Sequence, residues 1–302
     1  MYFTGFADEA AAGVDGQIKA TLELGWRDIE SRNIDGKNIH DLGDAEFEAA
    51  AAKLAAAGVR INCFGSAIAN WAKQIDQPFD SSLAETTRAI PRMQKLGTKL
   101  IRVMSFAVRK NVEGSDAADQ MEEERFRRVR ELTARFLDAG ITPVHENCMN
   151  YGGMGWSHTL KLLENVPGLK LCFDTGNPVF TDDRTLAKPH PKQSPWEFYS
   201  KVREHIAYIH VKDSVWDYQH GKQIFTFPGD GQGDVYAILK DLLARGYDGG
   251  ISIEPHLAVV FHDATVRSEE AVKYWNYVEY GRRLTGMIDR IRADLRREAA
   301  AK

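Results

Sequence analysis

Short apolar segments recur along the chain, and a stretch with helical periodicity follows each of them. The apolar segments are nearly continuous in Val, Ile, Leu, Phe and Cys, which is typical of strands that are covered on both faces, as in parallel sheets. We expect eight such strands, at residues 2–6, 28–32, 60–64, 100–106, 142–148, 170–175, 207–211 and 250–254.

The stretches between these strands are amphipathic, and a glycine ends four of them. Glycine after the last periodic residue is a common helix stop, because it adopts the left-handed conformation without strain. The predicted helices of this kind are 44–57, 81–96, 121–139 and 234–245, followed by Gly58, Gly97, Gly140 and Gly246. A further long helical region starts near Ser268 and is charged on most faces toward its end.

The alternation of eight strands with eight helical segments predicts an α/β protein with a parallel sheet. At this length, eight repeats favour a single (β/α)8 TIM barrel with a long C-terminal helix. No G-x-G-x-x-G motif follows the first strand, which disfavours an open dinucleotide-binding sheet. Because no linker or break in composition interrupts the pattern, we expect residues 1–302 to form one domain.

Composition restricts the partners and the compartment. The chain is 43% hydrophobic and 27% charged, with a net charge of -4, so it has no basic excess that would suit nucleic acid. Three cysteines without a CxxC spacing fit a reducing compartment better than a disulfide framework. There is no secretory signal and no apolar run of membrane-spanning length. We therefore expect a cytoplasmic protein that binds neither nucleic acid nor membranes.

Ionisable residues stand at the ends of four successive predicted strands: Glu146, Asp174, His210 and Glu254. In a barrel of parallel strands, all carboxyl ends lie on one rim, where active sites form. The four residues are about one strand–helix unit apart in sequence, so they should meet in space. Each of them alone would more often be a helix cap, an ion-pair partner or a satisfied core residue.

Three carboxylates buried close together cost several kcal/mol each unless a cation or a proton compensates them. A single divalent metal ion is the natural compensation. The ligand set is mostly hard oxygen with one imidazole and no thiolate, which suits Mn²⁺ first, then Mg²⁺, with Co²⁺, Fe²⁺ and Zn²⁺ also compatible. The same set argues against a structural zinc site.

The motifs "HEN", "FDTGN", "IHVKD", "GDGQGD" and "IEPH", in that order, carry a family resemblance. The chain resembles the xylose-isomerase-like barrel superfamily, in particular the sugar phosphate isomerase/epimerase group with ketose 3-epimerases, hydroxypyruvate isomerase and inosose dehydratase. The resemblance covers essentially the whole chain. It implies that Glu146, Asp174, His210 and Glu254 bind one divalent metal ion, and that Glu146 and Glu254 also act as catalytic acid and base.

Three other residues are expected to contact the substrate. Asn177 stands where ketose epimerases usually have a substrate-binding histidine, and Trp216 stands where they have an arginine. Both differences argue against a small free ketohexose. Lys212 shares the inward face of its strand with His210, and Trp216 offers an apolar face for a sugar ring or a bulkier aglycone, unless it serves only in packing.

His145 has two interpretations. If its strand is regular, Glu146 points into the barrel and His145 points away, toward the helices. If the strand has already ended, His145 reaches the substrate as an additional catalytic base. The second arrangement resembles barrels that cleave 3-oxo-glycosides, including C-glycoside deglycosidases.

The sequence thus predicts a metal-dependent isomerase or epimerase that acts on a keto sugar, or on a sugar derivative, through an enediolate. The alternative is a lyase or deglycosidase that cleaves a 3-oxo-glycoside by the same α-deprotonation. A repair nuclease with this barrel is disfavoured by the acidic charge, and a non-catalytic sugar-binding barrel by the intact ligand set. The expected partners are a small sugar and either a second copy of the chain or a small accessory subunit.

Overall fold

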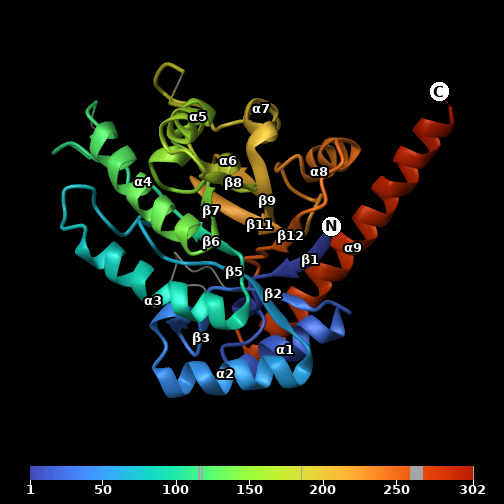
Figure 1. Cartoon of the computed structure of the whole chain (residues 1–302). Helices are drawn as coiled ribbons and strands as arrows, with labels where there is room; N and C mark the ends of the chain where they lie inside the picture. Colours follow the sequence, from blue (N-terminus) through green and yellow to red (C-terminus); the bar gives the residue numbers. More distant parts are fainter. Residues whose placement is uncertain (115, 117, 185, 259–267, 302) are drawn as a thin grey trace.

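Eight parallel strands form a barrel that helices surround in the computed structural model (Figure 1), which describes residues 1–114, 116, 118–184, 186–258 and 268–301. The barrel strands are β1 (Tyr2–Gly5), β2 (Asp28–Ser31), β5 (Arg60–Phe64), β6 (Leu100–Val103), β7 (Thr142–Glu146), β8 (Lys170–Asp174), β9 (Ile206–Val211) and β12 (Gly250–Ile253). They neighbour one another in chain order, and β12 pairs with β1. A single parallel bridge between Phe6 and Glu30 joins β1 to β2, so the ring is nearly closed. The predicted (β/α)8 barrel is confirmed.

Helices cover the outer face of the barrel. They are α1 (Val14–Glu23), α2 (Asp44–Ala57), α3 (Asp80–Leu96), α4 (Glu122–Asp138), α5 (Trp156–Asn165), α6 (Asn177–Phe180), α7 (Pro195–Val202), α8 (Val235–Ala244) and α9 (Glu270–Ala300). The four helices predicted from their terminal glycines are α2, α3, α4 and α8. Gly58 and Gly97 end α2 and α3 with φ of 63° and 70°, in the left-handed region where a side chain would be strained.

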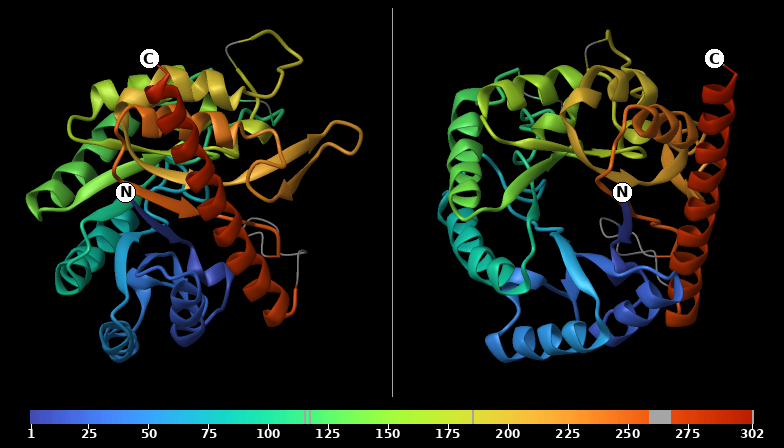
Figure 2. Two further views of the ribbon diagram at one scale, coloured as in Figure 1. Left: turned by 90° about the vertical axis from the view of Figure 1, so that its right-hand side faces the viewer. Right: turned by 45° about the vertical axis from the view of Figure 1, so that its right-hand side comes forward.

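Short elements lie in the loops that connect the barrel strands and helices. The 3₁₀ turns are η1 (Ala7–Glu9), η2 (Ile39–Asp41), η3 (Tyr151–Met154) and η4 (Arg203–His205). Two antiparallel hairpins also occur, β3 (Asn33–Ile34) with β4 (Lys37–Asn38), and β10 (Asp213–Asp217) with β11 (Lys222–Thr226). Figure 2 shows the β10–β11 hairpin projecting from the barrel, and α9 running along its side and beyond it.

Two strands end more than one residue earlier than their apolar sequences predict. The strand expected at 100–106 ends at Val103, because the Met104 and Phe106 amides bond instead to the carbonyls of Ile68 and Ala69 in a neighbouring loop. The strand expected at 142–148 ends at Glu146, whose carbonyl accepts the Cys148 amide in a tight turn. Apolar character continues past both ends because the following loops are themselves buried.

The alternation of side chains along each strand separates two cores. Inside the barrel, Cys63, Val144, Cys172 and Tyr208 form a small apolar cluster. Three of these residues lie two positions before Glu146, Asp174 and His210, so each strand turns an apolar residue and then a polar one inward. The large core lies outside, between strands and helices. None of the described helices is long and apolar enough to span a membrane.

Phe173 offers a test of the outer core. Its ring is fully buried and lies 5.7 Å and 5.8 Å, centroid to centroid, from Phe198 and Tyr199 of α7. We predict that Phe173→Ala lowers the free energy of unfolding by about 3–5 kcal/mol, because it removes burial and leaves a cavity. Urea denaturation followed by circular dichroism measures this. Tyr218→Ala, at a side chain that is 73% exposed, is the control and should change stability by less than about 0.5 kcal/mol.

Candidate metal centre

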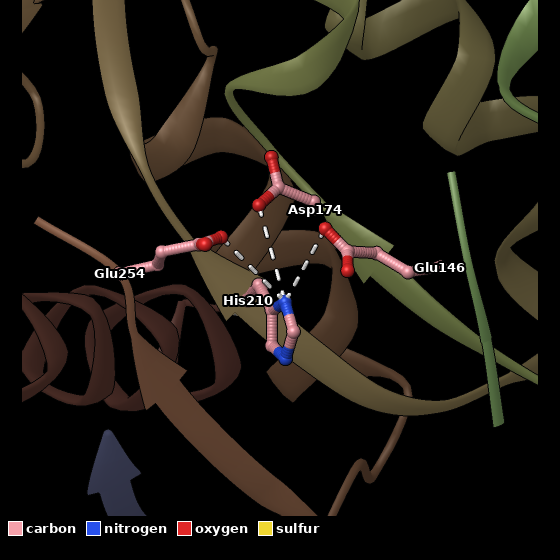
Figure 3. A group of neighbouring side chains, drawn as sticks. All are labelled: Glu146, Asp174, His210 and Glu254. Carbon is pink, nitrogen blue, oxygen red and sulfur yellow. Dashed lines mark ion pairs between the residues drawn. The ribbon is translucent and has the colours of Figure 1, made fainter. Parts of the chain in front are cut away.

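The four predicted ligands meet at the carboxyl ends of four adjacent strands (Figure 3). Glu146 and Asp174 are the last residues of β7 and β8, His210 lies near the end of β9, and Glu254 directly follows β12. All four are buried. His210 Nδ1 lies 3.7 Å from Glu146 Oε1, 4.0 Å from Asp174 Oδ2 and 3.9 Å from Glu254 Oε2.

These distances fit one metal ion. Metal–ligand bonds of about 2.0–2.3 Å place two ligands of the same ion roughly 3–4.5 Å apart. The four potential ligand atoms all lie within 4.8 Å of one another. Among the described residues, His210 Nδ1 has no hydrogen-bond partner and Asp174 Oδ2 has only its ion pair with Lys212, although buried polar atoms are normally satisfied. A bound cation would satisfy both.

Backbone amides fix the orientation of Asp174. Its Oδ1 accepts hydrogen bonds from the amides of Gly176 and Asn177, at 2.8 Å and 2.7 Å, in the turn that begins α6. Asn147 bonds both the amide and the carbonyl of Asp174, so the ends of β7 and β8 are held together. As a result, Oδ2 is the oxygen that faces the other three ligands.

A carboxylate from across the barrel orients His210. Glu30 on β2 lies 3.0 Å from His210 Nε2, and Ser252 on β12 donates a 2.6 Å hydrogen bond to the same carboxylate. This contact holds the ring so that Nδ1 faces the three carboxylates. A carboxylate behind a metal-bound histidine is a recurring arrangement that raises the basicity of the imidazole.

One arginine holds each of the two glutamates. Arg102 Nη1 lies 2.8 Å from Glu146 Oε2, and Arg32 Nη1 lies 3.2 Å from Glu254 Oε1. In both glutamates the other oxygen faces His210. Arg32 also pairs with Asp8 and Glu9, so these ion pairs extend from the cluster to the turn after β1.

The surroundings shift the pKa values of the three carboxyl groups in different directions. Burial raises the pKa of Asp174 to about 7, although Lys212 acts against it. Burial also acts to raise the pKa of Glu146, but Arg102 and His210 outweigh it and lower that pKa to about 2. For Glu254, Lys212 and His256 outweigh burial and lower the pKa well below its usual range. The two glutamates are therefore ionised, whereas Asp174 holds a proton until near neutral pH.

The structure places two of the three predicted substrate residues beside the cluster. Lys212 Nζ lies 3.0 Å from Glu254 Oε2 and 3.1 Å from Asp174 Oδ2, and Asn177 Nδ2 donates to Glu146 Oε1 at 3.0 Å. Both residues line a small cavity next to the ligands, with a volume of about 20 Å³.

Trp216 is positioned differently. It belongs to the β10–β11 hairpin, and the Lys192 ammonium lies 3.9 Å from the centroid of its ring. The described residues that line the small cavity include a different tryptophan, Trp71, from the loop after β5. The identity of the tryptophan at the rim depends on loop conformation, which the sequence pattern does not fix.

His145 points away from the four ligands, as the regular-strand interpretation predicts. It lies within β7 and is fully buried, with Nε2 3.0 Å from Ser105 Oγ and 3.0 Å from Asn150 Oδ1. Burial lowers its pKa to about 4, so the imidazole is neutral near pH 7. In this structure His145 therefore stabilises the loop after β7, outside the group of potential metal ligands.

Arg102 is absent from the site residues that the sequence predicts, and Glu30 is not among its predicted ligands. Both lie in barrel strands, in "LIRV" and "DIES", and both are buried. A buried charge in a barrel strand requires an opposite charge nearby. The charged residue within the strand could therefore have identified these positions from the sequence. Its partner could not be named, because that depends on the register between strands distant in sequence.

Comparison with known proteins assigns this barrel to a family. Residues 18–276 match the family model described as xylose isomerase-like TIM barrel. The chain belongs to this family. No match was found among curated proteins.

Three solved structures illustrate the similarity. A xylose isomerase-like TIM barrel protein from Mycobacterium smegmatis in complex with magnesium is 18% identical, with 95% of this chain and 97% of that chain covered and a TM-score of 0.65. A 3-keto-D-glucoside 4-epimerase from E. coli is 15% identical, with coverages of 93% and 99% and a TM-score of 0.61. A D-allulose 3-epimerase from Methylomonas sp. in complex with D-allulose is 14% identical, with coverages of 95% and 97% and a TM-score of 0.63. At these identities the likeness shows the fold.

Glu30 tests the orientation of His210. We predict that Glu30→Gln weakens Mn²⁺ binding by about 10–100-fold, because the neutral amide no longer fixes the imidazole. Isothermal titration calorimetry measures the affinity, and circular dichroism checks the fold. The matched control is Glu48→Gln at an exposed position on α2. Unchanged affinity in Glu30→Gln would contradict the assigned role.

Protons should compete with the metal ion for this cluster. Asp174 is protonated below a pKa of about 7, and although burial opposes it, Cys172 and Glu30 raise the pKa of His210 well above its usual range, so metal binding must displace a proton from each residue. We predict that the apparent affinity for Mn²⁺ rises by about tenfold or more per pH unit from roughly pH 5 to 7, and continues to rise above pH 7 as His210 loses its proton. Calorimetry in two buffers of different ionisation enthalpy also counts the protons released. An affinity independent of pH would argue against the cluster as the binding site.

Proposed function

We propose that the protein is a divalent-metal-dependent isomerase or epimerase that acts on a keto sugar, or on a sugar derivative, through an enediolate. The observation that carries the proposal is the pair of buried glutamates. Each has one oxygen held by an arginine and the other turned toward the same point beside His210 and Asp174. Such a pair can move a proton on either side of a carbon that lies between them.

Relatives support this choice of reaction class. The Methylomonas protein is named as a D-allulose 3-epimerase, and the E. coli protein as a 3-keto-D-glucoside 4-epimerase. The Mycobacterium smegmatis protein binds magnesium. We propose one ion held by Glu146, Asp174, His210 and Glu254, with Mn²⁺ as the first choice and Mg²⁺ as the next, because the donor set is mostly oxygen.

When bound, a divalent cation supplies Lewis acidity that polarises a ketone oxygen and acidifies the adjacent C–H bond. One of the two glutamates removes the proton from the carbon next to the carbonyl. The electron pair of that bond enters the enediolate, and the other glutamate must receive a proton before it can deliver one to the opposite face. For Glu254 the donor would be the Lys212 ammonium, 3.0 Å from Oε2, which regains its proton when the first glutamate releases the one that it removed. Return to the same carbon inverts its configuration, and return to the former carbonyl carbon gives the isomer.

The polar residues next to the glutamates would position the sugar. The Lys212 ammonium, buried at the edge of the cluster, can donate to a sugar oxygen while it keeps its contacts with Glu254 and Asp174. Asn177 already donates to Glu146 and so holds the oxygen that faces the reacting carbon. Positioning of this kind is a large part of enzymatic rate acceleration.

A second reaction uses the same residues. If the carbon next to the enediolate bears a leaving group, the electron pair expels it, and the enzyme is a lyase or deglycosidase. A large cavity that adjoins the cluster and could hold such a group favours this alternative. Deprotonation is common to both reactions, and only the fate of the electron pair differs.

Deuterium exchange tests the proposed chemistry. Mn²⁺-loaded protein is incubated in D₂O with ketoses and 3-oxo-glycosides, and NMR follows deuterium uptake and aglycone release. We predict uptake with at least one compound, and a loss of about 10²–10⁴-fold in Glu146→Gln and in Glu254→Gln. Glu164→Gln, at an exposed position on α5, is the matched control and should retain full activity.

The outcomes separate the candidate reactions. Uptake with inversion of one centre identifies an epimerase, whereas uptake with release of the aglycone identifies a lyase. If calorimetry shows that Mn²⁺ is bound but no compound exchanges, the proposed catalytic function is wrong.

A further inference from the structure

We propose that the substrate carries an apolar, aromatic substituent, and that this group occupies the large cavity beside the metal centre. The inference rests on the proposed function, because it places the reacting sugar at the four-ligand cluster. It goes further by naming the class of substrate: an aryl glycoside or a similar conjugate rather than a free ketose.

The large cavity has a volume of about 420 Å³, within the roughly 300–1,000 Å³ that ligand pockets enclose. Its walls come from the loops after β5, β6 and β7 and from the end of α6. The apolar side chains that line it are Trp71, Ala107, Val108, Met149, Met154 and Phe180. Ala107 and Met154 are buried, and the other four are half-buried, so the cavity is open to solvent on one side.

The large cavity adjoins the small one at the reacting centre. Four residues line both this cavity and the small one that touches Glu146, Lys212 and Glu254, namely Trp71, Cys148, Met149 and Phe180. A substituent on a sugar bound at the two glutamates would reach the large cavity by passing Trp71 and Phe180.

Two polar side chains in its wall already have partners. Asn150 accepts from Ser105 and the Gly152 amide and donates to the Glu146 carbonyl, and Thr181 donates to the Asn177 carbonyl. These groups are used inside the protein, so the wall presents them with little capacity for a polar occupant.

The charged residues at the edge of the cavity are paired with one another. Asp182 lies 2.7 Å from Lys192, and both Lys110 and Arg184 form ion pairs with Asp116. A phosphate or carboxylate on the substrate would have to compete for these cations. Thioethers and aromatic rings, by contrast, pack well against an aromatic group, so the wall suits an uncharged ring.

Two probes that differ only in the substituent test this. Methyl and phenyl 3-oxo-β-D-glucopyranoside are titrated into Mn²⁺-loaded protein by calorimetry, and each is followed for deuterium uptake in D₂O. We expect the phenyl compound to bind about tenfold or more tightly than the methyl compound, because the cavity buries its ring. Trp71→Ala should remove most of this preference.

Two further variants control the experiment. Trp275→Ala makes the same replacement at a 55% exposed position on α9 and should leave the preference unchanged. Val108→Lys alters only the large cavity, because Val108 is absent from the wall of the small one. It should weaken binding of the phenyl compound and leave methyl binding within about threefold, since the added ammonium opposes burial of a ring.

The results separate this inference from the proposed function. Equal affinities for both probes, no binding of the phenyl compound, or a preference that survives Trp71→Ala and Val108→Lys would overturn the assignment of the cavity. Deuterium uptake with equal affinities would leave the proposed function standing alone. Tight binding of the phenyl compound that depends on Trp71, without uptake or release, would support the cavity assignment and remove the proposed function.

Discussion

The constraint on which the site depends is the mutual repulsion of buried carboxylates. Among the residues that the structure describes, six carboxylates gather at the centre of the rim, and three Arg and Lys side chains face them. The carboxylates are Asp8, Glu9, Glu30, Glu146, Asp174 and Glu254, and the cations are Arg32, Arg102 and Lys212. Buried like charges are unfavourable unless a proton or a cation offsets them. A divalent ion at the ligand atoms would bring the balance close to neutrality.

The alternation of side chains along the barrel strands brings the ligands together. Each strand turns alternate residues inward, so Val144, Cys172 and Tyr208 form an apolar floor and the residues two positions later form the polar layer above it. The floor keeps water away from the lower side of the cluster. The ligands are thus carried by paired strands rather than by loops, and their spacing follows from the strand register. The loops above are free to shape the pocket for a particular substrate.

Much of this arrangement could be predicted from the sequence. The eight strands, the glycine-terminated helices and the convergence of Glu146, Asp174, His210 and Glu254 follow from periodicity and from the rule that carboxyl ends share one rim. The partners of the ligands could not be predicted, because the pairing of Arg102 with Glu146, or of Glu30 with His210, depends on which strand ends are level. Loop conformations could not be predicted either, so the sequence did not show that Trp71 lines the small cavity and that Trp216 contacts Lys192. The alternation rule left the direction of His145 conditional on where β7 ends.

The contact between β1 and β2 is the weakest point in the hydrogen bonding of the barrel. These two strands share a single bridge, at Phe6 and Glu30, while every other neighbouring pair forms a longer ladder. Yet β2 and the loop after it supply Glu30 and Arg32. These residues contact His210 and Glu254, which lie much later in the chain. A bound ion at this centre would therefore hold the first quarter of the polypeptide against the last, and it would strengthen the closure of the whole ring.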